Sequence, residues 1–284
     1  MSRVVQRTRM DTDGRATTHE HAAFLAGSSN RVRVLRALRE RPGRGAELAE
    51  RCSLPRSTVH RCLDGFTTRG WARKSGGDHR LTAAGALVLG AYEDLIGTVS
   101  ITGDYEEFLR HLGEVARTLP VGTLPGSTVV EATPENPHAT VEHYEQVFAA
   151  VAPKRMRGIV PIVSHVFNEA SRPLVEGGVE MGVVIDEAVL DTAREAYPAA
   201  HELGVESENF TIYVHPEAVS FGLAVFDDER VLVGAYDDAG NPRACLDGTD
   251  DALVDWAIGT YERYRREARR LGAGTEAETV VEAP

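Results

Sequence analysis

Two kinds of hydrophobic pattern follow one another along the chain. In the first part, apolar residues recur at helical spacing, as Val32, Leu35 and Leu38 do, which predicts amphipathic helices. In the second part, short apolar runs such as 179–185 alternate with helical stretches such as 138–151, which predicts buried strands between helices. The chain is therefore expected to contain a helical N-terminal domain and a C-terminal α/β domain.

The second part contains enough of these segments to form a sheet covered by helices. The expected strands are 128–132, 157–164, 179–185, 210–214, 221–226 and 231–236, and the expected helices are 138–151, 168–176, 187–203 and 250–271. Because strands that alternate with helices usually pair in parallel, we expect a mixed, largely parallel sheet.

The composition of the chain predicts five successive segments. The N-terminal stretch is polar without an apolar period, which is typical of a disordered arm, and the proline- and glycine-rich stretch 120–127 is the expected linker. The segments are an arm at 1–17, a winged helix-turn-helix at 18–82, connecting helices at 83–120, an α/β domain at 121–271 and a flexible tail at 272–284.

The most specific pattern is a helix-turn-helix in the N-terminal domain. Ala49 is small enough for two helices to cross, residues 53–55 (Ser-Leu-Pro) form a tight turn, and Val59 holds the second helix against the first. Glycine is common in such turns, so Ser53 departs from the usual pattern. Two short strands around a glycine turn follow at 71–81 and predict a wing.

Basic and polar side chains gather on the second helix of this motif and on the hairpin behind it. They are Arg56, Ser57, Thr58, His60 and Arg61 on the helix, and Arg73, Lys74, His79 and Arg80 on the hairpin. A recognition helix lies in the major groove, where arginine pairs with guanine, and a basic hairpin suits phosphates or the minor groove. The alternative is an ordinary helix with solvated arginines. Because motif and charge coincide, double-stranded DNA is the expected partner.

The net charge of -12 combines two oppositely charged parts. Residues 1–90 contain 17 lysines and arginines against 8 acidic residues, a balance of +9, whereas residues 91–284 contain 14 against 35, a balance of -21. A basic module joined to an acidic one favours nucleic-acid binding by the first. The chain has 29 arginines but only two lysines, Lys74 and Lys154. With the acidic balance this favours a salt-rich cytoplasm, although a GC-rich genome would also favour arginine.

Several classes of protein are not expected. The longest apolar runs are shorter than the roughly 18 residues that cross a bilayer, and residues 1–21 lack the apolar segment of a signal peptide. Cys52, Cys62 and Cys245 form neither a disulfide framework nor a zinc pattern, and the first two are expected to fill small core positions. We therefore expect a cytoplasmic protein with no cofactor, no metal and no membrane partner.

Four stretches of the chain resemble a known family. They are 24–35 (FLAGSSNRVRVL), 69–73 (RGWAR), 164–169 (SHVFNE) and 262–264 (ERY). These residues resemble archaeal winged-helix transcriptional regulators that join an ArsR/MarR-like DNA-binding domain to the methanogenesis regulatory protein middle domain. The likeness covers about residues 20–270 and implies transcriptional regulation without a particular ligand. Halophilic archaea have many such proteins, which agrees with the composition.

A small-molecule site is expected at the carboxyl ends of the buried strands, where open α/β sheets bind ligands. His165 and Asn168 follow one such strand and offer hydrogen bonds, and Phe167 offers an apolar wall. Tyr213 and His215 end another strand and are expected to face the same crevice. Simpler roles compete: Asn168 as a helix cap, His165 as a loop histidine, and the second pair as part of a proline turn.

An enzymatic role finds little support in the residues. The hairpin 220–236 resembles a hairpin of phospholipase-D-like domains, in which a nucleophilic histidine and a lysine precede an aspartate. Whether Asp227 or Asp228 is aligned with that aspartate, the histidine and lysine are missing. The corresponding positions hold Ser220 and Gly222, or Phe221 and Leu223. The sequence also has no glycine-rich phosphate loop, serine elbow or metal triad, so no catalytic residue is expected.

These observations favour a sequence-specific transcriptional regulator. The winged helix is expected to bind operator DNA, and helices within 83–118 to form part of a homodimer interface, because two-fold symmetry brings two recognition helices to successive half-sites. The C-terminal domain is expected to sense a small-molecule effector or to mediate dimerisation. Two alternatives remain, namely a hydrolase-like enzyme localised by its basic domain and an architectural DNA-binding protein without an effector.

Overall fold

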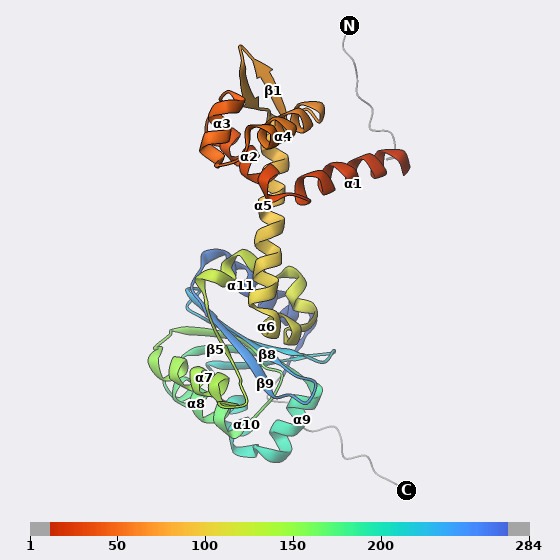
Figure 1. Cartoon of the computed structure of the whole chain (residues 1–284). Coiled ribbons are helices and arrows are strands. Elements are labelled where there is room, and N and C mark those ends of the chain that lie inside the picture. The colour runs from red at the N-terminus through yellow and green to blue at the C-terminus, as the bar shows by residue number, and fades with distance from the viewer. Residues whose placement is uncertain (1–11, 272–284) are drawn as a thin grey trace. The chain divides into compact units, whose positions relative to one another are not determined.

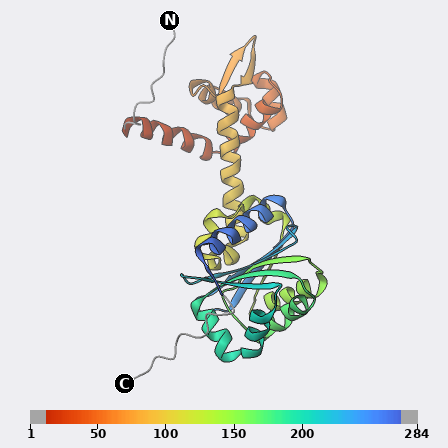
Figure 2. The same cartoon turned by 180° about the vertical axis from the view of Figure 1, so that it is seen from behind.

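The computed structural model describes residues 12–271, which form two compact units (Figure 1; Figure 2). The first unit extends to Gly97 and the second begins at Thr98. The division lies inside helix α5 (Ala83–Asp104), which carries the chain from one unit into the next. Much of the predicted N-terminal arm and the whole predicted C-terminal tail lie outside the described residues.

The first unit is a helix-turn-helix followed by a hairpin. Its elements before α5 are α1 (Thr12–Ala26), α2 (Ser29–Glu40), α3 (Gly45–Cys52), α4 (Arg56–Thr68), β1 (Ala72–Ser75) and β2 (Asp78–Leu81). The two strands pair antiparallel, and Gly43 adds a bridge to His79, which is the arrangement of a winged helix. Residues 12–17, which were expected to belong to a disordered arm, are helical. Their sequence is polar and has no apolar residues at helical spacing, so the hydrophobic pattern does not predict a helix there.

Apolar side chains from the helices and the hairpin meet in one core of the first unit. Leu35, Leu48 and Leu63, one from each of α2, α3 and α4, are at most 1% exposed. Phe66 and Trp71 close this core with stacked rings whose centroids lie 6.3 Å apart. Each fully buried side chain of this size contributes about 1.5–3 kcal/mol, so the predicted helical faces hold the motif together.

The start of α5 is fixed to this core. The Thr82 hydroxyl accepts a hydrogen bond from the Gly85 amide (3.1 Å) and caps the helix. Glycine is required at position 85, because a Cβ there would lie 2.1 Å from the carbonyl oxygen of Trp71. Further along, Glu93 pairs with Arg39 of α2 at 2.6 Å. The first half of α5 therefore belongs to the winged-helix fold.

The turn between α3 and α4 holds Ser53 in the left-handed region, with φ +52° and ψ +45°. From there its amide donates to the carbonyl oxygens at the end of α3, those of Ala49 and Glu50. A residue with a side chain costs about 1–2 kcal/mol in this conformation, which explains why glycine is common in the turn.

We expect Ser53→Gly to stabilise the motif by about 0.5 kcal/mol, because the relief of strain exceeds the entropy that glycine loses on folding. Ser53→Val should destabilise it by about 1–2 kcal/mol, since β-branched side chains fit the left-handed region poorly. Amide hydrogen exchange of α3 and α4 in the full chain measures both changes. Equal effects of the two substitutions would contradict a left-handed Ser53.

The described part of the second unit contains one eight-stranded sheet, in the order β10-β6-β5-β4-β7-β8-β9-β3. The strands are β3 (Thr128–Glu131), β4 (Arg155–Ile159), β5 (Glu180–Asp186), β6 (Phe210–His215), β7 (Phe221–Phe226), β8 (Arg230–Tyr236), β9 (Pro242–Gly248) and β10 (Arg269–Arg270). The helices are α6 (Glu106–His111), α7 (Ala139–Ala150), α8 (His165–Glu176), α9 (Glu187–Ala196), α10 (Pro198–Glu206) and α11 (Asp251–Glu267), with the 3-10 helices η1 (Gly113–Thr118) and η2 (Val121–Gly126).

The mixed α/β fold is confirmed, whereas the expectation of largely parallel pairing is wrong. Among the described strands only β4–β5 and β5–β6 pair in parallel. Short turns rather than helices join β7, β8 and β9, and short turns allow only antiparallel neighbours. Residues 120–127, expected as a linker, include η2 and bury Leu124 completely in the second unit. The boundary between the units therefore lies upstream, in α5.

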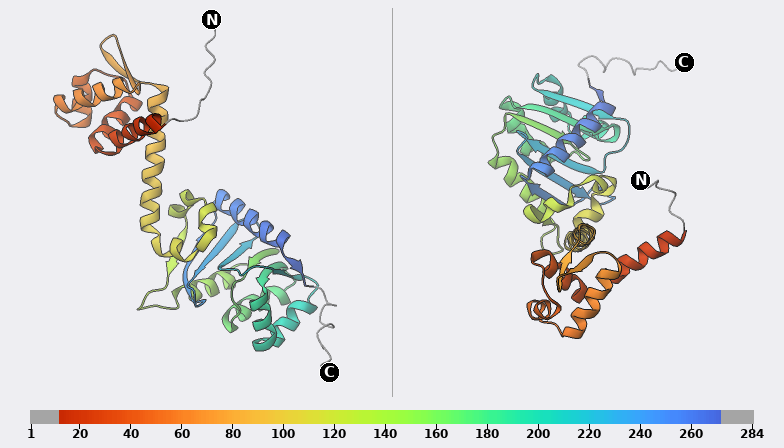
Figure 3. Two further views of the ribbon diagram at one scale, coloured as in Figure 1. Left: turned by 90° about the vertical axis from the view of Figure 1, so that its right-hand side faces the viewer. Right: turned by 90° about the horizontal axis from the view of Figure 1, so that it is seen from above.

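Side-chain alternation gives this sheet two different apolar faces. Helices cover both faces (Figure 3). Helices α6 and α11 cover one face, where large side chains such as Phe221 and Leu223 are buried. Helices α7 to α10 cover the other face, against Met156 and Met181. The two faces differ in how completely they are filled, and the cavity described below lies on the second.

A buried carboxylate joins the second face to a helix and a neighbouring strand. Asp247 of β9, with a side chain 9% exposed, accepts two hydrogen bonds from Arg230 of β8, at 2.8 and 2.7 Å. His143 of α7 places its Nε2 3.0 Å from the same carboxylate. Burial alone would raise the pKa of Asp247, but these partners outweigh burial and hold that pKa below its ordinary value.

Because the folded-state pKa of Asp247 is depressed, its ion pair stabilises the fold above the unfolded pKa of about 3.9 and is lost as the pH falls through the folded value. We expect Asp247→Asn to lower the free energy of unfolding by about 2 kcal/mol at neutral pH, a difference that shrinks below about pH 4. Chemical denaturation across this pH range measures it, with exposed Asp238→Asn as control. A difference that is independent of pH would contradict the role of the carboxylate charge.

Candidate functional site

The outward face of α4 is polar and basic. The predicted residues on it are exposed or, for Thr58, partly exposed: Arg56, Ser57, Thr58, His60 and Arg61. The opposite face of the same helix, including Val59, is buried in the core. His60 lies 3.4 Å from Asp64 one turn later, whereas neither Arg56 nor Arg61 has an acidic partner within 4 Å in the described chain. The structure therefore exposes both arginines to solvent in the first half of the helix.

The hairpin β1–β2 places basic side chains opposite one another. Arg73 pairs in register with Arg80, and Lys74 pairs with His79. Arg73, Lys74 and Arg80 are exposed, and like charges directly opposite destabilise a hairpin unless an anion offsets them. His79 is partly buried, and burial together with Lys74 lowers its pKa, so it adds no positive charge at neutral pH.

Several other arginines of the first unit are used by the fold itself. Arg51 donates to the carbonyl oxygens of Ala37 (3.0 Å) and Arg41 (2.9 Å). Arg69 lies over the ring of Phe24, 3.7 Å from its centroid. Sequence reasoning missed Arg44, whose exposed side chain lies 3.8 Å from Asp78 of the wing. Its signal was a basic residue immediately before α3.

Helix α5 carries a second feature, an apolar and uncharged half. Its large hydrophobic side chains that are 46–76% exposed are Leu87, Leu95, Ile96 and Val99. At about 100° per residue these fall on one half of the helix, and the acidic Glu93, Asp94 and Asp104 fall on the other. By length and hydropathy alone α5 meets the requirement for a membrane span. No such helix was expected, because acidic residues interrupt its apolar runs.

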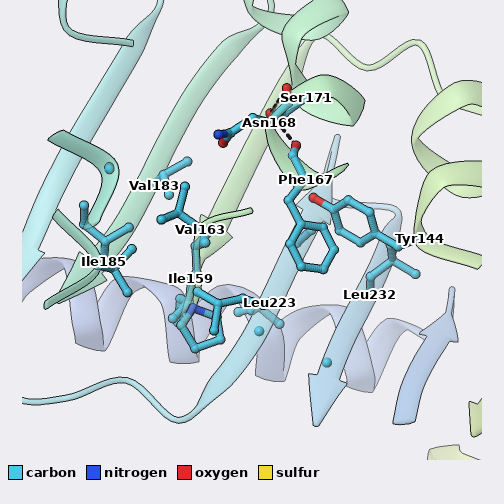
Figure 4. Close-up of a pocket in the computed structure, with 18 of the residues that line it drawn as sticks. Tyr144, Ile159, Val163, Phe167, Asn168, Ser171, Val183, Ile185, Leu223 and Leu232 are labelled. Carbon is cyan, nitrogen blue, oxygen red and sulfur yellow. Dashed lines mark hydrogen bonds between the residues drawn. The ribbon is translucent and has the colours of Figure 1, made fainter. Parts of the chain in front are cut away.

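The second unit contains a cavity of about 180 Å³, partly open to solvent, between the sheet and helices α7 to α10 (Figure 4). Its sheet-side lining comes from several strands, including Met156 of β4 and Val183 of β5. Its helix-side lining includes Tyr144 of α7, Phe167 of α8 and His201 of α10. The cavity lies wholly within the second unit.

The cavity exists because the centre of the sheet carries small residues on this face. Gly222 and Ala224 of β7 and Gly234 of β8 occupy positions that hold large side chains in an ordinary buried strand. The ring of Tyr236 fills part of the freed space, since a Cβ on Gly222 or Gly234 would approach it to 3.0 or 2.9 Å. The remaining space is the cavity.

Of the three ligand residues predicted within 165–168, two line the cavity and one does not. Figure 4 shows the carboxamide of Asn168 between Val183 on one side and the rings of Phe167 and Tyr144 on the other. The two rings meet edge to face, with centroids 4.6 Å apart. His165 is exposed at the first turn of α8 and is not part of the lining. The cap of α8 is Ser164, which accepts from the Phe167 amide at 3.3 Å, so Asn168 is not a helix cap.

The second predicted pair lies on the opposite face of the sheet. Along β6, Phe210 and Ile212 point to the cavity, so Tyr213 and His215 do not share the crevice with Asn168. His215 is buried against Tyr264, with ring centroids 4.9 Å apart, and accepts a hydrogen bond from the Glu217 amide at 3.1 Å. The expectation of one shared crevice is wrong, because the parity of a strand position decides which face its side chain joins.

Sequence reasoning missed most of the cavity lining. Tyr144, His201, Tyr236 and Cys245 all contribute to it. Each lies on a different helix or strand, and no local motif joins them. The one signal in the sequence was the pair of glycines at 222 and 234, inside segments that otherwise have the pattern of buried strands.

The positions that would carry hydrolase chemistry serve the fold. Phe221 and Leu223 are buried in the core under α11, and Leu223 also contributes to the lining of the cavity (Figure 4). Asp227 and Asp228 form the turn of the hairpin with positive φ, and Asp227 accepts a hydrogen bond from the Lys154 amide at 2.9 Å. Within residues 12–271 no group of three or more His, Cys, Asp or Glu side chains is placed to hold a metal ion.

Comparison with known families finds a match in each unit. Residues 137–267 match the family model described as methanogenesis regulatory protein FilR1, middle domain. Residues 19–103 match the HVO_A0261 N-terminal domain. The expected resemblance to the regulatory middle domain is confirmed, whereas the ArsR/MarR-like assignment of the first domain stays a prediction. A comparison with curated proteins finds no match.

Solved structures also resemble the chain. TrmBL2, described as an archaeal chromatin protein with a novel mode of DNA binding, is 12% identical with a TM-score of 0.39, over 89% of this chain and 100% of that one. Nuc from Salmonella typhimurium, a phospholipase D family member, is 15% identical with a TM-score of 0.41, over 52% and 99%. NucT from Helicobacter pylori is 10% identical with a TM-score of 0.41, over 51% and 98%. No activity follows from identities this low.

Proposed function

We propose that the protein is a DNA-binding transcriptional regulator of the cytoplasm that acts as a homodimer and responds to a small molecule. The first unit binds operator DNA through α4 and the wing. The second unit is not an enzyme in this proposal and instead holds the effector site. The match of residues 137–267 to a regulatory protein domain supports the regulatory role.

The observation that carries the proposal is the set of basic side chains without acidic partners on α4 and the wing. Arg56 and Arg61 have no carboxylate within 4 Å in the described chain, although the whole chain has 43 acidic residues. Arg73 and Arg80 lie opposite each other across the hairpin, an arrangement that repels without an anion. A phosphate backbone supplies that anion, and guanine edges suit arginines at the start of a recognition helix.

We expect the double variant Arg56→Ala/Arg61→Ala to lose at least about tenfold of its preference for a duplex from the protein's own upstream region over a scrambled duplex of equal length. Fluorescence anisotropy over a potassium chloride series measures this preference. Each lost phosphate contact would also reduce, by about one, the slope of the logarithm of the association constant against the logarithm of the salt concentration.

The matched control is Arg117→Ala/Arg194→Ala, which removes the same charge from the second unit, where both arginines pair with acidic neighbours on their own helices. The control should keep the wild-type preference. If the wild-type protein binds both duplexes equally at every salt concentration, sequence-specific regulation is contradicted and the architectural alternative is favoured.

The uncharged half of α5 is the proposed dimer interface, with a second copy of the chain as its partner. Four large apolar side chains of this half are exposed, and a soluble chain with a net charge of -12 gains by covering them with an identical apolar surface. A two-fold axis there also provides two winged helices for two half-sites.

We expect Leu95→Glu to dissociate the dimer and to weaken binding to a two-half-site duplex by at least about tenfold, because the second half-site contact is no longer intramolecular. Sedimentation velocity measures the mass in solution. Ser100→Glu introduces the same charge on the other half of α5 and should leave the dimer intact. A wild-type protein that sediments as a single chain would rule out this interface.

A further inference from the structure

The lining of the cavity in the second unit limits the kind of ligand that can bind there. All 32 residues that line it lie in the described chain, and none of them is Asp, Glu, Lys or Arg. We infer that the cavity binds a small, uncharged molecule with an apolar, single-ring body and a hydrogen-bond acceptor at one end. This inference rests on the proposed function, because it names the chemical class of the effector.

The size of the cavity limits the ligand to about one ring. An apolar cavity of about 150 Å³ in another protein binds benzene. The cavity here measures about 180 Å³, which adds room for a small substituent. Aromatic side chains on its walls, among them Tyr144 and Phe167, offer the edge-to-face and stacked contacts that rings prefer.

The polar end of the ligand follows from two nitrogen atoms. Nδ2 of Asn168 and Nε2 of His201 are buried and have no hydrogen-bond partner within the described chain. Both residues line the cavity. A carboxamide nitrogen can only donate, so it requires an acceptor such as a carbonyl oxygen. An unpaired buried donor is costly, and a ligand oxygen would remove that cost.

The environment disfavours an anionic ligand. An anion that enters the cavity loses its hydration and finds no fixed cation in the lining. Burial also disfavours the ionised forms of two side chains of the lining. It raises the pKa of the Cys245 thiol to about 12 and raises the pKa of the Tyr144 hydroxyl well above its ordinary value. The same physical cause that keeps these groups neutral excludes carboxylates and phosphates.

Three probes of equal size and nearly equal shape separate these requirements. Benzamide is neutral with an acceptor, benzoate is its anionic isostere, and α-methylstyrene is its apolar isostere. Ligand-observed NMR and calorimetry on the full-length protein should show benzamide binding at least tenfold more tightly than benzoate and more tightly than α-methylstyrene. Equal affinity for benzamide and benzoate, or no binding of any of the three, would overturn the inference.

Three variants locate the binding. Ala224→Leu fills the cavity and should abolish benzamide binding, while circular dichroism and DNA affinity confirm that the protein remains folded. Asn168→Leu should remove the advantage of benzamide over α-methylstyrene. His165→Ala changes an exposed residue of the same helix outside the cavity and should change nothing. Benzamide binding that survives in folded Ala224→Leu would place the site elsewhere and overturn the inference.

Ligand binding and DNA binding are measured independently, so that failure of the cavity inference can be distinguished from failure of the proposed function. Binding of benzamide is measured without DNA, and preference for the native duplex is measured without benzamide. Benzamide binding together with loss of duplex preference in the wild-type protein would support the cavity and contradict the regulator. Duplex preference without binding of any probe would support the regulator and overturn the cavity inference.

Discussion

Alternation of large and small side chains along the central strands determines the architecture of the second unit. Phe221 and Leu223 point to one face of β7 and build a filled core under α11. Gly222 and Ala224, between and beside them, point to the other face and leave a hollow under α7 to α10. Glycine weakens a strand interior, so the chain gives up stability here for space. One face of the sheet therefore packs into a filled core, and the other face forms one wall of the cavity.

The arginines of the first unit also fall into two groups, those that pair within the fold and those exposed on α4. In the first unit, carboxylates and carbonyl groups bind the arginines that hold the fold together, as Glu93 does with Arg39 and as Ala37 does with Arg51. Within the described residues, Arg56 and Arg61 in the first half of α4 have no acidic partner within 4 Å. The acidic second unit lowers non-specific attraction to polyanions, which leaves the contact with nucleic acid to one small surface. At high salt concentration, phosphate contacts weaken and specific base contacts carry more of the affinity.

Local patterns were sufficient to predict the winged helix and most helices and strands of the second unit. They failed where the answer depends on long-range pairing. Hairpin connections, not composition, make β7 to β9 antiparallel, and β9 with its proline start was not predicted. Phe167 and Asn168, predicted beside a strand end, line the cavity. Tyr213 and His215 point to the face of the sheet opposite the cavity, because alternate residues of β6 point to opposite faces. The cavity could not be predicted, because residues from many elements form its walls.

The near absence of lysine has a practical consequence for the two-unit architecture. The winged unit has a single side-chain amine, Lys74 on the exposed wing, and the second unit has a single one, Lys154, exposed just before β4. Amine-reactive dyes therefore reach one side chain in each unit without any substitution, and the α-amino group is the other amine with which they react. Energy transfer between dyes on the two lysines would measure the distance between the wing and the second unit with and without DNA.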